Sequence, residues 1–98
     1  MTPEGKVKKQ VTDLLKKVNA YYFFPATGGY GRSGVPDIVA CYRGRFIAIE
    51  CKAGKGEPTA LQTRELFRVR SEGGFALVIR ESTVFKVQEL LESIRESH

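Results

Sequence analysis

The sequence predicts a mixed α/β fold, in which helices flank a central mixed β-sheet in the order α-β-β-β-α-β-α. Two hydrophobic patterns lead to this expectation. Three segments repeat their apolar residues with the period of an amphipathic helix, and four shorter segments are rich in strand-forming residues. The chain has 98 residues, 42% of them hydrophobic, which suits a single domain spanning residues 1–98.

The three predicted helices are recognised from their caps and apolar stripes. The first covers residues 2–19 and the second residues 59–72, and each begins with a threonine suited to the N-cap position. Gly73 and Gly74 are expected to end the second helix. Ser82 is expected to cap the third helix. The apolar stripe of that helix consists of Val84, Val87, Leu90, Leu91 and Ile94.

The four predicted strands share a high content of β-branched and aromatic residues. They cover residues 21–24, 37–42, 45–51 and 75–80. Arg43 and Gly44 form a tight turn between the second strand and the third. The last strand follows a helix, so we expect it to be buried and to lie parallel to its neighbour. The aromatic segment 21–24 favours a core or dimer contact over base stacking.

Charge and composition restrict the class of protein. Sixteen Lys and Arg against eleven Asp and Glu give a net charge of +5, which attracts polyanions and favours nucleic acid as a partner. The same charge is also an ordinary aid to solubility. No apolar run is long enough to span a membrane, so we expect a cytoplasmic protein. His98 is the only histidine and is terminal, so acid-base or metal chemistry must use carboxylates and lysines.

The predicted hairpin brings two carboxylates together. If Arg43 and Gly44 form the turn, Asp37 lies opposite Glu50 on the antiparallel strand. Opposed Cβ atoms lie roughly 4.5 to 5.5 Å apart, so the two carboxylates repel unless a cation lies between them. A Mg²⁺ ion with its preference for oxygen ligands resolves this conflict. Strand alternation puts Lys52 on the same face, beside the expected metal-bound water.

Alternation also separates the two cysteines. Cys41 is expected on the face of the carboxylates and Cys51 on the other face, so no disulfide is predicted between them.

The alternative interpretation of the hairpin is that Glu50 and Lys52 form a plain surface stripe and Asp37 only begins a strand. Burial of an unpaired carboxylate after an apolar run is costly, which favours the metal site.

These motifs resemble the PD-(D/E)xK nuclease superfamily, and within it the VRR-Nuc (virus-type replication-repair nuclease) family, in its stand-alone viral or phage-type form. The resemblance spans nearly the whole chain and implies a restriction-endonuclease-like core. The matching motifs are Glu4, Gly34-Val35-Pro36-Asp37, Glu50-Cys51-Lys52 and Gln62. The resemblance implies that Mg²⁺ or Mn²⁺ is bound by Asp37, Glu50 and the carbonyl of Cys51, with Glu4 nearby. It also implies a catalytic Lys52 and an active-site Gln62.

The resemblance further implies a structure-specific DNA endonuclease that forms a homodimer like those of Holliday junction resolvases and acts on four-way junctions in a bacterial or phage-infected cell. A flap nuclease or an unspecific nickase would use the same residues. A non-catalytic nucleic-acid-binding module is the alternative from another class, although it would be expected to lack Asp37, Glu50 or Lys52.

Six residues are candidates for contact with DNA. They are Lys9, Tyr30, Arg32, Lys55, Arg64 and Arg68. For each basic side chain a solvated surface position is the alternative. Residues 29–34 also match the dinucleotide motif G-x-G-x-x-G, but a strand follows them where that motif requires a helix, so no nucleotide cofactor is expected.

Overall fold

The computed structural model describes residues 1–26 and 33–97, and its elements follow the predicted order. The helices are α1 (Pro3–Lys17), α2 (Ala60–Ser71) and α3 (Phe85–Ser97). The strands are β1 (Tyr21–Phe23), β2 (Ile38–Tyr42), β3 (Arg45–Cys51) and β4 (Phe75–Ile79). They form one sheet in the order β1-β2-β3-β4, in which β2 pairs antiparallel with β1 and β3, and β3 pairs in parallel with β4. The α/β class and the parallel last strand are therefore confirmed.

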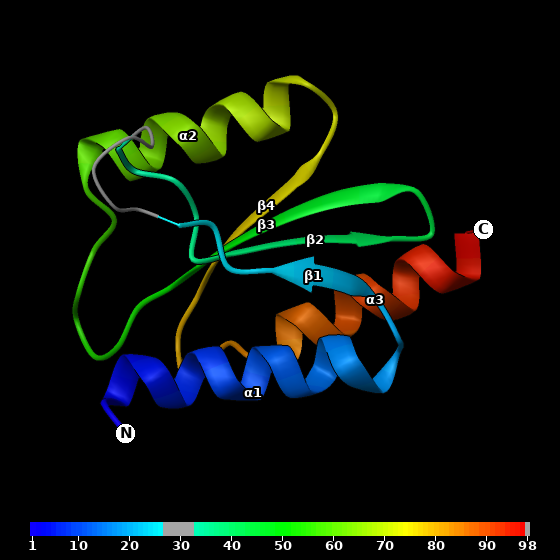
Figure 1. Ribbon diagram of the computed structural model, residues 1–98, viewed down its shortest axis with the longest axis horizontal. Helices are drawn as coiled ribbons and strands as arrows, with labels where there is room; N and C mark the ends of the chain where they lie inside the picture. The colour runs from blue at the N-terminus through cyan, green and yellow to red at the C-terminus, as the bar shows by residue number, and fades with distance from the viewer. Residues whose placement is uncertain (27–32, 98) are drawn as a thin grey trace.

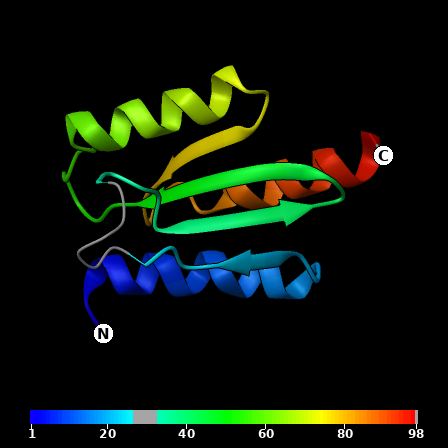
Figure 2. The same ribbon diagram turned by 45° about the horizontal axis from the view of Figure 1, so that its top comes forward.

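The sheet lies between two helical layers of unequal size (Figure 1, Figure 2). Helices α1 and α3 pack on one face, where their apolar stripes meet the buried side chains of β2 and β3. Helix α2 packs alone on the other face, in a small cluster with Ala48, Leu66 and Ala76 at its centre. No helix in the described part of the chain is long and apolar enough to cross a membrane.

The turn between β2 and β3 has the predicted position. Arg43 has a φ of 51° and Gly44 a φ of 80°, so both central residues are left-handed, as a type I′ hairpin turn requires. Tyr42 pairs with Arg45, and the register continues to the pair Ile38 and Ile49. One step further along the same register are Asp37 and Glu50. The register on which the metal prediction depends is thus confirmed.

Two of the three predicted helix caps are present. The backbone N–H of Gly5 donates to the Thr2 hydroxyl at 3.0 Å, and that of Gln62 donates to the Thr59 hydroxyl at 3.2 Å. The expectation that Ser82 caps the last helix is wrong, because α3 begins only at Phe85.

A turn ahead of α3 explains the later start. The N–H of Thr83 donates to the carbonyl of Arg80 at 2.9 Å, and the Thr83 hydroxyl accepts from the N–H of Arg80 at 2.8 Å. These bonds satisfy the backbone groups in a turn and compete with an earlier helix start. The expected apolar stripe still faces the core, since Val87, Leu91 and Ile94 are buried.

Strand β4 is less buried than its sequence suggests. Ala76 and Ile79 are buried, whereas Phe75 is 37% exposed. The strand lies at the edge of the sheet, so only part of it is covered by neighbours. The prediction of a buried strand is therefore confirmed for Ala76 and Ile79 and is wrong for Phe75.

Candidate metal centre

Three carboxylates converge at one end of the sheet. Glu4 comes from the first turn of α1, Asp37 from the residue before β2, and Glu50 from the end of β3. One carboxylate oxygen of each lies within 4.8 Å of the others. The hairpin register brings Asp37 to Glu50, and the packing of α1 on the sheet adds Glu4. Oxygen ligands gathered in this way suit a hard divalent cation.

Glu50 is the buried member of this group, with 1% of its surface exposed. Its Oε2 atom accepts a hydrogen bond from Nε2 of Gln62 at 2.8 Å and lies 3.5 Å from Nζ of Lys52. Its Oε1 atom is buried and has no hydrogen-bond partner among residues 1–26 and 33–97. A buried oxygen without a partner is costly, and a cation at this point would satisfy it. The residues present therefore fit a divalent metal ion.

The electrostatic surroundings of Glu50 lead to the same conclusion. Burial and, after it, the nearby charge of Asp37 raise the pKa of Glu50 to about 7, although the charge of Lys52 opposes the rise. Near neutral pH, the carboxyl group is therefore close to the midpoint of its titration. A cation bound here would favour the ionised form.

Asp37 is fixed by the backbone of the neighbouring strand. Its Oδ2 atom accepts a hydrogen bond from the N–H of Cys51 at 2.8 Å. The Cys51 thiol is fully buried on the face of the sheet under α1 and α3, and burial raises its pKa to about 12, so the thiol stays neutral. Cys41 is exposed and lies on the face of the carboxylates, as predicted. Cys51 contacts the carboxylate of Asp37 through its backbone N–H.

Gln62 is placed by the N-terminus of α2. Its Oε1 atom accepts from the N–H of Thr59 at 2.9 Å, which completes a capping box and leaves Nε2 to donate to Glu50. Gly34 allows the chain before Asp37 to approach this helix. A Cβ atom on Gly34 would lie 2.6 Å from the carbonyl carbon of Leu61, and Gly34 has a φ of +81°. Gly34 belongs to the predicted motif, but no pattern in the sequence indicates this close approach to α2.

The loop after Lys52 is hydrogen-bonded to the residues that follow β4, a contact that was not predicted from the sequence. Arg80 donates to the carbonyl of Gly54 at 3.2 Å and to the carboxylate of Glu57 at 3.0 Å. The carboxylate of Glu81 accepts from the N–H of Gly54 at 3.1 Å. In the sequence, these contacts are indicated only by the pair Arg80-Glu81, which ends the strand that is expected to lie parallel to residues 45–51.

The structure describes four of the six residues predicted to contact DNA, and these four lie on three different segments. Tyr30 and Arg32 fall outside the described residues. Lys55 is exposed in the loop after β3, and Lys9 on α1 forms an exposed ion pair with Asp13 at 3.0 Å. Two arginines are on α2: Arg64 lies on its exposed surface and Arg68 lines a hollow between this helix and the sheet.

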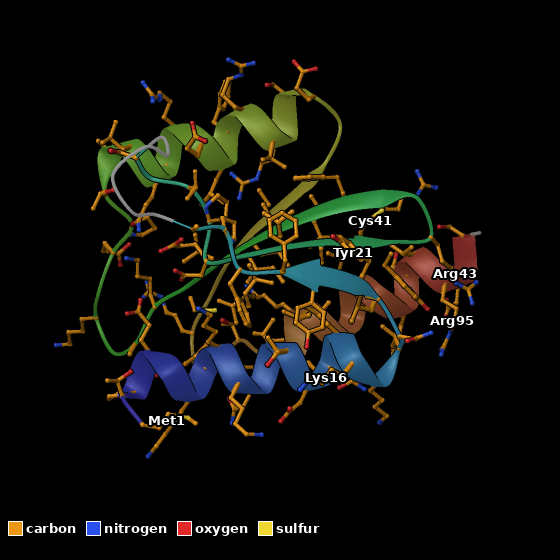
Figure 3. The ribbon with its side chains drawn as sticks, viewed as in Figure 1. Met1, Lys16, Tyr21, Cys41, Arg43 and Arg95 are labelled. Carbon is orange, nitrogen blue, oxygen red and sulfur yellow. The ribbon has the colours of Figure 1, made fainter. Side chains whose placement is uncertain are left out.

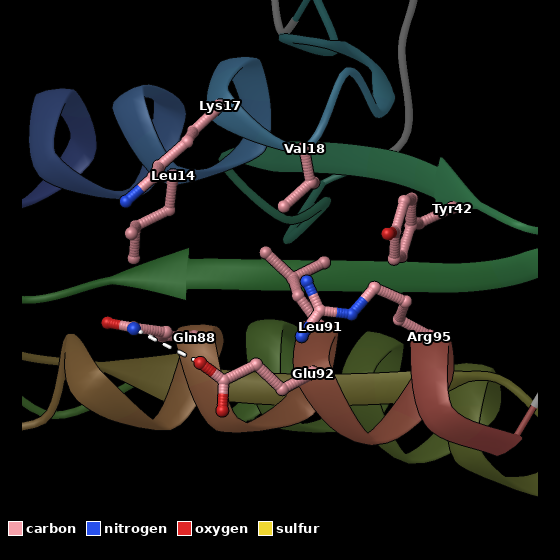
Figure 4. Close-up of a pocket in the computed structure, with 8 residues that line it drawn as sticks. All are labelled: Leu14, Lys17, Val18, Tyr42, Gln88, Leu91, Glu92 and Arg95. Carbon is pink, nitrogen blue, oxygen red and sulfur yellow. Dashed lines mark hydrogen bonds between the residues drawn. The ribbon is translucent and has the colours of Figure 1, made fainter.

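A separate pocket lies between α1 and α3 (Figure 4). Its lining residues are Leu14, Lys17, Val18, Tyr42, Gln88, Leu91, Glu92 and Arg95. Glu92 is the one carboxylate among them, and it accepts a hydrogen bond from Gln88 at 3.2 Å. Leu14 is ten residues along α1 from Glu4, or about 15 Å at the rise of an α-helix. This pocket is therefore not part of the carboxylate site.

Three comparisons with known proteins match most of this chain. The model of the archaeal Holliday junction resolvase (Hjc) family matches residues 10–71, which contain Asp37, Glu50, Lys52 and Gln62 but not Glu4. "Putative nuclease p44" of Acyrthosiphon pisum secondary endosymbiont phage 1 is 35% identical over 79 residues, covering 78% of this chain and 81% of that protein. A solved "VRR_NUC domain" is 26% identical, covers 94% of this chain and 97% of its own, and superposes with a TM-score of 0.74.

Proposed function

This chain belongs to the archaeal Holliday junction resolvase (Hjc) family of PD-(D/E)xK nucleases, and on that premise we propose that it is a metal-dependent endonuclease that hydrolyses DNA phosphodiester bonds. Family membership supplies the reaction class, phosphodiester hydrolysis. The observation that carries the metal dependence is the buried Oε1 atom of Glu50, which lacks a hydrogen-bond partner in the described chain and lies beside the other carboxylates.

The carboxylate cluster supplies the proposed metal ligands. Asp37 and Glu50, with the backbone carbonyl of Cys51, hold Mg²⁺ or Mn²⁺, and Glu4 completes the set from α1. When bound, such an ion activates water as a nucleophile and stabilises charge on a phosphate. The hydrogen bond from the N–H of Cys51 keeps Asp37 directed toward Glu50.

Lys52 and Gln62 have different proposed roles. Lys52 carries a positive charge 3.5 Å from Oε2 of Glu50, where it orients the attacking water and stabilises negative charge that builds up on the phosphate oxygens. Gln62 donates to the same carboxylate oxygen and holds Glu50 in one orientation, which makes it a positioning residue. The capping box of α2 in turn holds Gln62.

For the substrate we favour branched DNA, cut by a symmetric homodimer. A two-fold dimer presents two equivalent sites, which suits paired nicks across a four-way junction. The net charge of +5 supports binding to the phosphate backbone. The proposed backbone contacts are those of Lys9, Arg32, Lys55, Arg64 and Arg68, with Tyr30 available for stacking.

The decisive assay incubates the protein with four-way junctions, flaps and linear duplexes in Mg²⁺ or Mn²⁺, beside Glu50→Ala and Lys52→Ala variants. We expect metal-dependent cleavage that both substitutions strongly reduce. If only four-way junctions are cut, and the cuts are symmetric, the result supports a junction resolvase. Equal cutting of flaps or duplexes indicates a less specific nuclease. Binding of junctions without any cleavage would indicate a non-catalytic module, and cleavage that survives both substitutions would overturn the site.

A further inference from the structure

The chain between β3 and α2, residues 52–59, forms a loop beside the carboxylate site (Figure 1). It begins with Lys52 and contains Gly54 and Gly56. Residues 54–57 are exposed, so apolar burial contributes little to their position. Glycine-containing segments lose much conformational freedom when they are ordered. A defined position for this loop therefore depends on polar contacts.

The side chain of Arg80 supplies these contacts. Its Nη1 atom donates to the carbonyl of Gly54 at 3.2 Å and to the carbonyl of Gly56, and its Nη2 atom donates to the carboxylate of Glu57 at 3.0 Å. A planar guanidinium group can bind several acceptors at once because its donors are fixed in a fork. The side chain of Glu57 is 77% exposed, and exposed ion pairs stabilise little, so the two carbonyl contacts contribute most to holding the loop.

Strand β4 gives these contacts a fixed base. The N–H of Lys52 donates to the carbonyl of Ile79 at 2.9 Å, which extends the pairing of β3 and β4 by one step. Ile79 is fully buried, and Arg80 and Glu81 follow it directly. The carboxylate of Glu81 accepts from the N–H of Gly54 at 3.1 Å. The end of β4 thus holds the loop through one backbone group and two side chains.

Gly56 lies against the side chain of Lys52. A Cβ atom built on Gly56 would lie 4.0 Å from Cδ of Lys52, which is ordinary van der Waals contact. The Lys52 side chain is only 16% exposed, and its Nζ atom lies 3.5 Å from Oε2 of Glu50. A lysine side chain has many rotamers in water, so a backbone wall beside its stem reduces the positions open to the ammonium group. The loop that Arg80 holds therefore limits where this charge can lie.

We propose that Arg80 is a positioning residue for the nuclease reaction. It holds Gly56 against the Lys52 side chain and so keeps the ammonium group beside Glu50. The inference rests on the proposed function and adds to it a residue that acts through the loop and does not touch the substrate. A displacement of about 1 Å in a group that acts on the reacting atoms can slow a reaction by about 10²-fold. Loss of Arg80 should therefore slow cleavage more than it weakens DNA binding.

The first test follows the loop by NMR in the metal-free protein. In the wild type we expect a nuclear Overhauser effect between Gly56 and the Lys52 side chain. In Arg80→Gln this effect should be lost, and the Gly56 amide should exchange with water at least about 10-fold faster, because its hydrogen bond to the carbonyl of Ala53 is no longer held in place. The amide of Ile49, a fully buried residue of β3, is the reference for an intact fold. An unchanged Gly56 exchange rate or a retained Lys52 effect in the variant would overturn the inference.

The second test measures binding and single-turnover cleavage in Mg²⁺ of the DNA that the wild type cuts fastest among four-way junction, flap and duplex. Arg80→Gln should reduce the cleavage rate constant at saturating protein by about 10-fold or more. Its dissociation constant for DNA should match that of Arg95→Gln, the control that removes the same charge away from the loop. Arg95 is exposed in the last turn of α3, and Figure 3 shows it at the hairpin end of the sheet. Weaker DNA binding by Arg80→Gln than by Arg95→Gln, or equal cleavage rates in the two variants, would overturn the inference.

A double-mutant cycle tests whether Arg80 acts through Lys52. In the Lys52→Ala background, Arg80→Gln should cause less than about 2-fold further loss of rate, since the group that it positions is gone. A loss as large as in the wild-type background would overturn the inference. If Arg80→Gln does not fold, Arg80→Lys takes its place in all three measurements. Lysine keeps the charge but not the planar fork, so the same changes are expected at smaller size.

The two kinds of readout separate this inference from the nuclease proposal. The NMR measurements need no metal, DNA or cleavage, so they decide whether Arg80 holds Gly56 and Lys52 even if the protein does not cut DNA. Absence of cleavage together with a lost Lys52 effect in Arg80→Gln would overturn the nuclease proposal and leave the loop contact standing. Metal-dependent cleavage that Arg80→Gln leaves unchanged would do the reverse.

Discussion

The two faces of the sheet differ in what they bury. The face under α1 and α3 holds an aliphatic core, which includes Val7, Val11, Leu15, Ile38, Ile47, Ile49, Ile79, Val87, Leu91 and Ile94. The face under α2 has a core centred on Ala48, Leu66 and Ala76, and it also carries the buried carboxylate of Glu50. One face thus supplies most of the apolar burial, and the other has room for groups that cost stability.

This division has a physical reason. Apolar burial stabilises by about 25 cal/mol per Å², so the larger cluster offsets the cost of a partly unsatisfied carboxylate. The comparison predicts that substitutions on the two faces separate stability from activity.

The largest effect is expected in the core under α1 and α3. Leu15→Ala should lower the free energy of unfolding by about 3–5 kcal/mol, because Leu15 is fully buried in a large cluster that cannot collapse around the cavity. Leu66→Ala, in the smaller cluster, should cost about 2 kcal/mol. Urea unfolding measures both, with Phe67→Ala, at a 64% exposed position, as a control that changes little. A larger loss for Leu66 would contradict the comparison.

The next effect concerns the chemistry of the α2 face. Lys52→Ala should reduce the cleavage rate by about 10²–10³-fold, because it removes the charge that we propose acts at the phosphate, while DNA affinity stays nearly constant. Single-turnover cleavage and a binding titration measure the two quantities separately. Lys86→Ala, at an exposed position on α3, is the control and should alter neither. A parallel loss of binding and cleavage in Lys52→Ala would place this lysine in DNA binding instead.

Glu50 makes the stability of the metal-free protein depend on pH. Its folded pKa of about 7 lies above the ordinary value of 4.5, so the folded state holds the proton more tightly. Below pH 4.5 both states are protonated and this contribution to stability is complete. As the pH rises through 7, the free energy of unfolding should fall by roughly 3 kcal/mol.

Urea unfolding in EDTA between pH 4 and pH 8 measures this fall, and the isosteric variant Glu50→Gln supplies the comparison. The variant lacks the titrating group, so its stability should decline less with pH than that of the wild type. Parallel curves for the two proteins would mean that Glu50 titrates normally.

The smallest effect is expected at the hairpin turn. Arg43→Asn should raise the free energy of unfolding by about 0.5 kcal/mol, because asparagine tolerates the left-handed conformation with a φ of 51° better than arginine does. Loss of the contact between the Arg43 guanidinium and the Tyr42 ring, 5.5 Å to the centroid, limits this gain. Gly44→Ala should instead lower stability by about 1 kcal/mol. Thermal unfolding that shows Arg43→Asn less stable than wild type would contradict the turn assignment.

The local part of the site could be predicted from the sequence. The turn at Arg43 and Gly44 sets the register, and the register with strand alternation gives the positions of Asp37, Glu50 and Lys52. These relations depend on residues close together in one hairpin. They therefore need no knowledge of how the helices pack.

The long-range part could not be derived in this way. Glu4 reaches the site only because α1 packs on the sheet, and the resemblance to known nucleases, not its spacing, indicated its role. The close approach of Gly34 to Leu61 and the hydrogen bond from Arg80 to the carbonyl of Gly54 each join segments more than twenty residues apart. Such contacts leave no periodic signal in the sequence.

The most direct test of the carboxylate site is calorimetric titration of Mn²⁺ into the wild type and Glu50→Gln at pH 8, without DNA. The substitution keeps the shape of the side chain and removes its charge. We predict that the wild type binds Mn²⁺ and that the variant binds it at least about 10-fold more weakly, as expected for loss of one ligand. Equal Mn²⁺ affinity in the two proteins would contradict the assignment of Glu50 as a metal ligand.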